Sequence, residues 1–218
     1  MVVRRPPSVL AVLLVTALLA VAGCSSGHSS SSTTTSTRLP SRNDPALGPA
    51  LLATTDLPPG FAAAPGTDNT ITAFCFGEDA VSGLQATARA YAAFTRTPAG
   101  VGIVHLIFRF RKGDGTKFVD QATSILNRCS NVPDIHGLAF TYEASAASID
   151  NAMAGTDDFV SRHGTSVGRG NLGEDVAVFR RGDLGELVAV LTNSLPRDQT
   201  DAVALAAVTA AVRRAPAG

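Results

Sequence analysis

Apolar and polar side chains alternate between residues 104 and 111. Successive side chains of a strand point to opposite faces, so this pattern predicts a strand with one face in the core. The apolar set, expected to face the core, is Val104, Leu106, Phe108 and Phe110. The polar set, expected to face away from it, is His105, Arg109 and Arg111.

The preceding segment, residues 85–96, is ambiguous because its regularly spaced alanines suit a helix as well as a strand. We favour a strand, with Ala86, Ala88, Ala90, Ala92 and Phe94 on one face. Residues 97–100 read Thr-Pro-Ala-Gly, with proline at the second and glycine at the fourth position, as in a β-turn. The two segments therefore predict a hairpin.

Two helices are predicted. After Gly113-Asp114-Gly115, one helical stripe of apolar residues comprises Phe118, Ala122, Ile125, Leu126 and Cys129. A last helix is expected over 197–214, because acidic residues in its first turns and basic residues in its last turn complement the helix dipole. These are Asp198, Asp201, Arg213 and Arg214, and the residues expected to face the sheet are Leu205, Val208 and Val212.

Further strands are predicted at 140–146 and 159–167, with a hairpin formed by 174–181 and 186–192. Near the start of the domain, a short helix at 49–55 should end at the Pro-Pro-Gly turn of residues 56–61, with Leu57 and Phe61 pinning that turn to the core. Strands joined by short turns give an antiparallel sheet. The predicted class is α+β: a mainly antiparallel sheet with helices packed on one face.

The N-terminus has the order of a secretory signal: Arg4 and Arg5, an apolar run at 9–22, and small residues before Cys24. Val21-Ala22-Gly23-Cys24 also resembles the lipobox of bacterial lipoproteins, in which the cysteine sulfur carries lipid. The apolar run of 14 residues is shorter than the about 20 that a membrane-spanning helix needs. We therefore expect a signal peptide at 1–23 and lipid on Cys24. A signal that is cleaved without lipidation is the alternative.

Residues 24–44 comprise this cysteine and a Ser/Thr-rich linker, whose composition predicts disorder, and 45–214 form the domain. If Cys24 is acylated, Cys75 and Cys129 are left as an even pair in an oxidising compartment. A disulfide between them is expected, and two free buried thiols are the alternative.

The near-neutral charge of the chain argues against binding to nucleic acid through a broad basic surface. The chain has 18 basic and 18 acidic residues, and loss of Arg4 and Arg5 with the signal leaves a formal net charge of −2. Such a chain offers no basic surface for nucleic acid. No cofactor is expected.

Short motifs in the chain do not indicate chemistry. Gly-Thr-Ser-Val-Gly at 164–168 matches a nucleophile elbow around Ser166, but neither a helix nor a histidine follows it. Gly-Arg-Gly-Asn-Leu-Gly at 168–173 precedes a strand, whereas a dinucleotide site needs a helix there. Arg-Gly-Asp at 181–183 is read as a turn. His28 lies in the linker, and His105, His136 and His163 share no metal-ligand spacing, so neither a catalytic nor a metal site is predicted.

Four features in order resemble a family of mycobacterial lipoproteins that share a domain with the extracytoplasmic sensor of PknH-type Ser/Thr kinases. They are Leu-Leu-Ala-Thr-Thr-Asp-Leu-Pro-Pro-Gly-Phe at 51–61, Cys75, the strand and helix from Val104 to Cys129, and Arg-Gly-Asn at 169–171. The resemblance implies an α+β domain proposed to bind an unidentified ligand. The kinase sensors carry two disulfides, whereas the cysteines of this sequence suffice for one, and we expect no kinase domain in the same polypeptide.

The sequence thus predicts a lipid-anchored, sensor-like binding domain on the outer face of the cell membrane. We expect it to be non-catalytic and to bind a small-molecule or envelope ligand, through residues that the sequence does not identify. A carrier of lipid or another apolar molecule is the first alternative, and a large dry cavity would favour it. A cell-envelope hydrolase is the second, and it would need clustered carboxylates with histidine.

Overall fold

The computed structural model describes residues 43–65, 81, 83–128, 139–167 and 172–215. All of them belong to one compact unit, Ser36–Gly218. The predicted signal peptide, most of the linker, Cys24, Cys75 and Cys129 lie outside the described residues.

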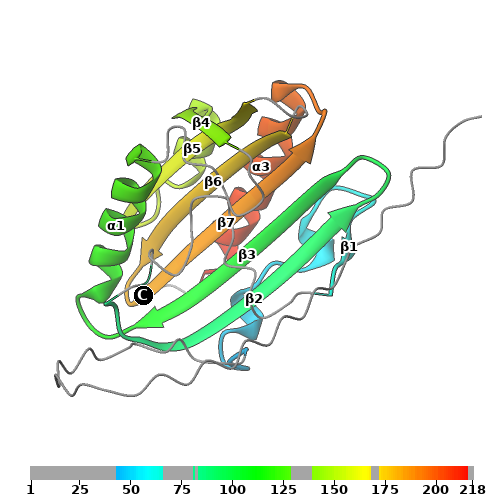
Figure 1. Cartoon of the computed structure of the whole chain (residues 1–218). Coiled ribbons are helices and arrows are strands. Elements are labelled where there is room, and N and C mark those ends of the chain that lie inside the picture. Colours follow the sequence, from blue (N-terminus) through cyan, green and yellow to red (C-terminus); the bar gives the residue numbers. More distant parts are fainter. Residues whose placement is uncertain (1–42, 66–80, 82, 129–138, 168–171, 216–218) are drawn as a thin grey trace, which may run out of the picture. The chain divides into compact units, whose positions relative to one another are not determined.

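A seven-stranded antiparallel sheet organises the domain (Figure 1). Its spatial order is β1-β2-β3-β7-β6-β5-β4, so the two long hairpins β2–β3 and β6–β7 meet where β3 pairs with β7. The strands are β1 Ala62–Ala63, β2 Ala86–Arg96, β3 Val101–Phe110, β4 Ala139–Ala144, β5 Asp158–Val167, β6 Leu172–Arg181 and β7 Leu184–Asn193. The predicted antiparallel α+β class is confirmed.

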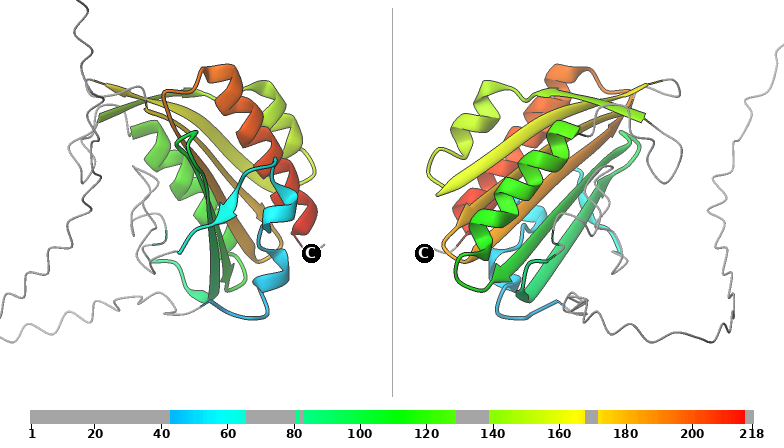
Figure 2. Two further views of the ribbon diagram at one scale, coloured as in Figure 1. Left: turned by 90° about the vertical axis from the view of Figure 1, so that its right-hand side faces the viewer. Right: turned by 60° about the vertical axis from the view of Figure 1, so that its left-hand side comes forward.

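Helices cover both faces of this sheet, and the prediction that they pack on one face is wrong. Helix α1 (Asp114–Arg128) lies on one face, whereas α2 (Ala147–Ala152) and α3 (Arg197–Arg214) lie on the other, as Figure 2 shows. Two 3₁₀ turns, η1 (Gly48–Ala50) and η2 (Thr54–Asp56), also contribute to the α3 side. The physical reason is that the central strands are apolar on both faces, so each face needs its own cover.

On the α1 side, the predicted apolar stripe of the helix meets the apolar set of β3. Phe118 lies with ring centroids 5.8 Å from Phe108 and 5.2 Å from Phe110. Gly185 of β7 makes this approach feasible, because a Cβ there would lie 2.5 Å from the Phe118 ring. Val119, Ala122 and Leu126 complete the buried face of α1, and the predicted stripe is confirmed as far as residue 128.

On the α3 side, the contact between helix and sheet is made largely by alanine. The buried residues of α3 are Thr200, Val203, Ala204, Ala207, Val208, Ala210 and Ala211. They pack on a layer that includes Ile103, Phe179, Val188 and Val190, together with Ile149 and Met153 of the α2 region. The bounds of α3 agree with the predicted range 197–214. Small side chains bring the helix close to the strands, which offsets the low aromatic content of the chain.

The smaller elements differ from the predictions in detail. Strand β2 takes the place of the ambiguous segment, and residues 97–100 form the turn to β3. The predicted helix at 49–55 is replaced by the two separate 3₁₀ turns, and the short helix α2 was not predicted. Leu57 is buried, whereas Phe61 is only partly buried and lies under the Arg96 guanidinium.

His105 corrects the prediction for the polar set of β3, because it is 0% exposed. Its face of the strand lies beneath η1, η2 and α3 instead of solvent. The Leu52 N–H donates to His105 Nδ1 at 3.1 Å, so the proton of the neutral ring sits on Nε2, which lies 2.9 Å from Glu186 Oε2. This buried pair joins two strands and holds the N-terminal segment on the sheet.

Candidate functional site

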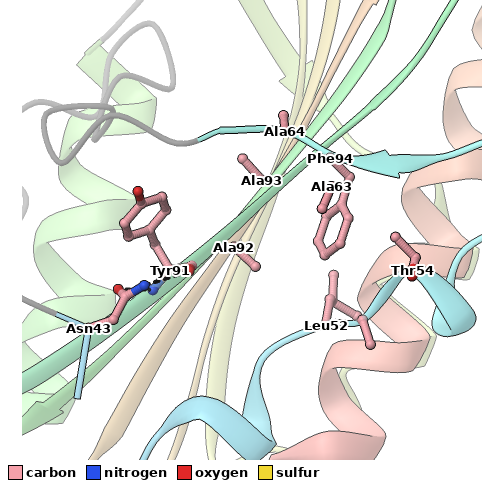
Figure 3. A pocket seen from close by; sticks show the side chains of 10 residues that line it. Asn43, Leu52, Thr54, Ala63, Ala64, Tyr91, Ala92, Ala93 and Phe94 are labelled. Atoms are coloured by element: carbon pink, nitrogen blue, oxygen red, sulfur yellow. Dashed lines mark hydrogen bonds between the residues drawn. The ribbon is translucent and has the colours of Figure 1, made fainter. Parts of the chain in front are cut away.

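The described residues form a pocket of about 460 Å³ at the outer edge of β2 (Figure 3). Strand β1 pairs with β2 only at Phe94 and Thr95, so the neighbouring part of that edge is left for other segments. The pocket is open to solvent, and its lining mixes small apolar side chains with polar groups. The lining residues are Asn43, Leu52, Ala53, Thr54, Ala63, Ala64, Tyr91, Ala92, Ala93 and Phe94.

At one end of this pocket, the side-chain amide of Asn43 bonds to the backbone of Tyr91 at the edge of β2, as a neighbouring strand would. Its Oδ1 accepts from the Tyr91 N–H at 2.9 Å, and its Nδ2 donates to the Tyr91 carbonyl at 3.3 Å. The next residue, Asp44, donates its N–H to the Arg89 carbonyl at 2.7 Å. At the other end, the Ala64 N–H donates to the Ala93 carbonyl at 2.8 Å. The pocket therefore has ends that are fixed by backbone pairing.

A second polar region lies on the α3 side, where β5, β6 and the start of α3 meet. His163 and Asp175 are cross-strand partners in the β5–β6 register, and their side chains share the face that α3 covers. His163 Nδ1 lies 2.9 Å from Asp175 Oδ1 and 3.9 Å from Asp201 Oδ1. One potential ligand atom from each of these three residues lies within 4.8 Å of the other two. We call this group the acid–histidine cluster.

Burial differs across the acid–histidine cluster. The side chains of His163 and Asp175 are 5% and 4% exposed, whereas that of Asp201 is 20% exposed. Asp201 is the fifth residue of α3, and Arg197, one turn earlier, places its Nε 3.7 Å from Asp201 Oδ2. Arg197 also pairs with Glu143 of β4. The cluster is thus closed on the sheet side and opens to the surface past Asp201.

Mutual proximity changes the proton affinities in the acid–histidine cluster. The hydrogen bond to Asp175 raises the pKa of His163, although burial opposes this effect. Burial, followed by the negative charge of Asp175, raises the pKa of Asp201, and Arg197 counteracts part of that rise. The hydrogen bond favours the charged form of His163, whereas burial favours the neutral form of Asp201.

Two carboxylate oxygens of the acid–histidine cluster are buried without a hydrogen-bond partner among the described residues. They are Asp175 Oδ2 and Asp201 Oδ1. Buried carboxylate oxygens ordinarily have partners, so each such atom needs an explanation. A single proton on His163 Nδ1 satisfies Asp175 Oδ1 and no other oxygen, because Asp201 is too far for a hydrogen bond.

The residues singled out from the sequence are not brought together. Cys24, Cys75, Cys129, His28 and His136 lie outside the described residues. Ser166 accepts from the Leu172 N–H and, by strand alternation, lies on the opposite face of β5 from His163, so the two are not a nucleophile–base pair.

The acid–histidine cluster is not evident from the sequence, because its members are distant in the chain. The sequence does contain a signal for two of its members. In an antiparallel pair such as β5–β6, moving one residue forward on one strand moves the partner one residue back on the other. The register of one pair, for example Phe159 with Phe179, therefore places His163 opposite Asp175. Nothing in the linear pattern connects either residue with Asp201, which reads only as a helix-dipole charge.

Comparison with solved structures identifies one with a similar α+β fold. The chain resembles the extracellular domain of PknH from Mycobacterium tuberculosis with a TM-score of 0.51 and 12% identity, over 73% of this chain and 92% of that one. A mutant of the protein Mog1 aligns with a TM-score of 0.35 and 13% identity over 71% of this chain and 80% of that one, a likeness too weak to support an argument. No family model matches the chain, and no curated protein matches it.

Among the residues that the structure describes, no helix has the length and apolarity needed to cross a membrane.

Proposed function

We propose that this protein is a non-catalytic, sensor-like binding domain, held by lipid on Cys24 at the outer face of the cell membrane. The observation that carries the proposal is the shared fold with the extracellular domain of PknH, which extends over 92% of that domain. The signal-like N-terminus and the lipobox around Cys24 support export and anchoring. The ligand is a small molecule or a component of the cell envelope.

The pocket at the β2 edge is the proposed binding place. Its volume of about 460 Å³ falls within the range of small-molecule sites. It is open and partly polar, with the Asn43 amide and the Thr54 hydroxyl in its lining. These properties favour a small ligand with polar groups over the apolar cargo of a lipid carrier.

The chemistry of the described residues supports binding more than hydrolysis. A His–carboxylate group of the kind that hydrolases use is present in the acid–histidine cluster, but Ser166 lies on the other face of β5. His163 also has its Nδ1 between two carboxylates. The proposal therefore assigns no reaction to the cluster.

Native mass spectrometry of the protein extracted from its own membrane tests the binding proposal. We expect a small molecule to co-purify with the wild-type chain and to be lost from Ala63→Trp, because Ala63 is exposed and lines the pocket. Ala62→Trp is the matched control, since Ala62 is the exposed neighbour in β1 and does not line the pocket. Equal retention by both variants, or no bound molecule in the wild type, would contradict the proposed site.

Membrane fractionation tests the anchor separately. The Cys24→Ala protein should leave the membrane fraction, because two or three acyl chains hold a protein firmly and their loss leaves no lipid. Retention of this variant in the membrane after a high-salt wash would overturn the anchor.

The Cys75–Cys129 disulfide is part of the same proposal, since it requires an oxidising compartment. Peptide mapping of non-reduced, exported protein should recover the two cysteines in one cross-linked species. Two alkylatable thiols at these positions in freshly exported material would show that the bond does not form.

A further inference from the structure

We propose that the acid–histidine cluster of His163, Asp175 and Asp201 is a binding site for a divalent transition cation of the zinc type. The site is separate from the pocket at the β2 edge, and it does not depend on the identity of the ligand there. Its three donors come from β5, β6 and α3, which places the cation between the sheet and the start of the helix.

The donor atoms have the spacing that one small cation requires. Ligands bound tetrahedrally to zinc at about 2.1 Å lie about 3.4 Å from one another. His163 Nδ1 lies 2.9 Å from Asp175 Oδ1 and 3.9 Å from Asp201 Oδ1, values that bracket this separation. The third separation, between a carboxylate oxygen of Asp175 and one of Asp201, is at most 4.8 Å, so shifts of roughly 1 Å would bring all three atoms into the coordination sphere.

Unpartnered oxygens give independent support for a cation. Asp175 is 3% exposed, and its Oδ2, which is not the oxygen that contacts His163, has no hydrogen-bond partner among the described residues. Asp201 turns one oxygen inward to His163, and that atom likewise has no hydrogen-bond partner there. A cation bound between the three side chains would contact the His163 nitrogen and one oxygen from each of the two carboxylates. A single proton on the His163 ring can bond to only one of these oxygens.

The charge of the acid–histidine cluster also matches a divalent ion. With a neutral His163 ring, Asp175 and Asp201 contribute two negative charges. Arg197 pairs with the exposed Glu143 and also lies 3.7 Å from Asp201 Oδ2, so its single positive charge is shared between two carboxylates and does not neutralise the cluster. One nitrogen and two carboxylate oxygens suit zinc or cobalt better than calcium, which prefers six to eight oxygens.

Asp201 provides the route of access. Its side chain is 20% exposed, while those of the two strand residues are almost sealed. Three protein ligands leave a coordination position for water, as in other three-ligand zinc sites. That position would face the surface next to Arg197.

Isothermal titration of Zn²⁺ into the chelator-treated, full-length chain in detergent tests the proposal. We expect saturable binding with one ion per chain, and weaker binding of Ca²⁺ by more than about 100-fold. Asp201→Asn and His163→Gln should each weaken Zn²⁺ binding by at least about tenfold, because even outer-shell changes cost about 10–100-fold. Co²⁺ should give visible absorption bands that Asp201→Asn removes.

Asp198→Asn is the matched control, because it removes the same charge from the first turn of α3 and its residue is outside the cluster. It should change Zn²⁺ affinity by less than about twofold. Circular dichroism checks that each variant is folded. If His163→Gln does not fold because His163 is buried, the test rests on Asp201→Asn, whose residue is partly exposed. Absence of one-to-one binding, equal affinity for Ca²⁺ and Zn²⁺, or equal losses in Asp198→Asn and Asp201→Asn would overturn the proposal.

Discussion

His105 and His163 lie on the same side of one sheet, and each pairs with a carboxylate at 2.9 Å, yet their surroundings differ. His105 and Glu186 are both 0% exposed, and the second ring nitrogen of His105 accepts the Leu52 N–H. His163 has two carboxylates at one ring nitrogen, and one of them reaches the surface. The His105–Glu186 pair holds chain segments together. Around His163, two carboxylates lie close together, and a single proton on Nδ1 can bond to only one of them.

This comparison shows that pairing with a carboxylate does not by itself mark a functional histidine. Glu186 Oε1 is also buried without a hydrogen-bond partner among the described residues, so an unpartnered oxygen alone is not decisive either. What distinguishes the acid–histidine cluster is a third donor, Asp201, and a path to solvent. We therefore expect changes at His105 to affect folding, and changes in the cluster to affect ion binding.

The largest expected effect is at His105. His105→Leu should lower the free energy of unfolding by about 3–5 kcal/mol, because it leaves the Glu186 carboxylate buried without its partner. The double variant His105→Leu/Glu186→Leu should be more stable than the single variant, since apolar replacement of both partners removes the buried charge. Urea unfolding of the four proteins of the cycle measures this. A loss below about 1 kcal/mol in the single variant would show that the pair is not structural.

The next effect is at the hydroxyl pair that joins α3 to the sheet beside the acid–histidine cluster. Thr200 Oγ1 lies 3.1 Å from Thr192 Oγ1, and both residues are buried. Thr200→Val should cost about 1 kcal/mol, the usual value of one buried hydrogen bond, and should leave Zn²⁺ stoichiometry unchanged. Thermal unfolding and ion titration check the two parts. Loss of the ion site in this variant would mean that the position of α3 depends on the hydroxyls more than on its apolar face.

A smaller effect is expected at Asp56, whose segment covers His105. Asp56 Oδ2 pairs with Arg214 Nε of α3 at 2.5 Å and accepts the Ala53 N–H at 2.6 Å. Asp56→Asn removes the charge and should cost about 0.5 kcal/mol near neutral pH. Amide exchange at Leu52, which donates to His105, should become faster in the variant. Unchanged exchange would show that the ion pair does not fasten the segment.

The same residue gives a pH dependence. Burial raises the pKa of Asp56, but the Ala53 N–H and the Arg214 charge outweigh it, and the net pKa lies below the ordinary 3.8. A lowered folded-state pKa means that the contribution is present above the ordinary value and is lost as the pH falls through the folded value. The stability difference between wild type and Asp56→Asn should therefore shrink below about pH 4. A difference that stays constant as the pH falls well below about 4 would contradict this assignment.

The smallest expected effect is at Asp201 in metal-free protein. Asp201→Asn should change the free energy of unfolding by less than about 0.5 kcal/mol, because the residue is partly exposed and its loss relieves repulsion with Asp175. Zn²⁺ should raise the midpoint of thermal unfolding of the wild type and not that of the variant. A large loss without metal would make Asp201 a structural residue like His105 and would erase the contrast between the two regions.

Much of the secondary structure could be predicted from local pattern. The hairpins, the stripe on α1 and the charged ends of α3 are local properties of period and capping. The conversion of 49–55 into two 3₁₀ turns and the presence of α2 could not be predicted, because helices this short depend on tertiary packing.

Local sequence pattern is enough to specify an α+β antiparallel domain, because side-chain alternation and helical periodicity are properties of neighbouring residues. Which faces are buried depends on tertiary packing. Helices and 3₁₀ turns cover both faces of the sheet, and His105 is therefore buried, although strand alternation predicts that it is exposed. Tertiary packing also brings Asp201 to His163 and Asp175. Contacts between distant residues depend on how a helix docks on a sheet, and no local pattern encodes that docking.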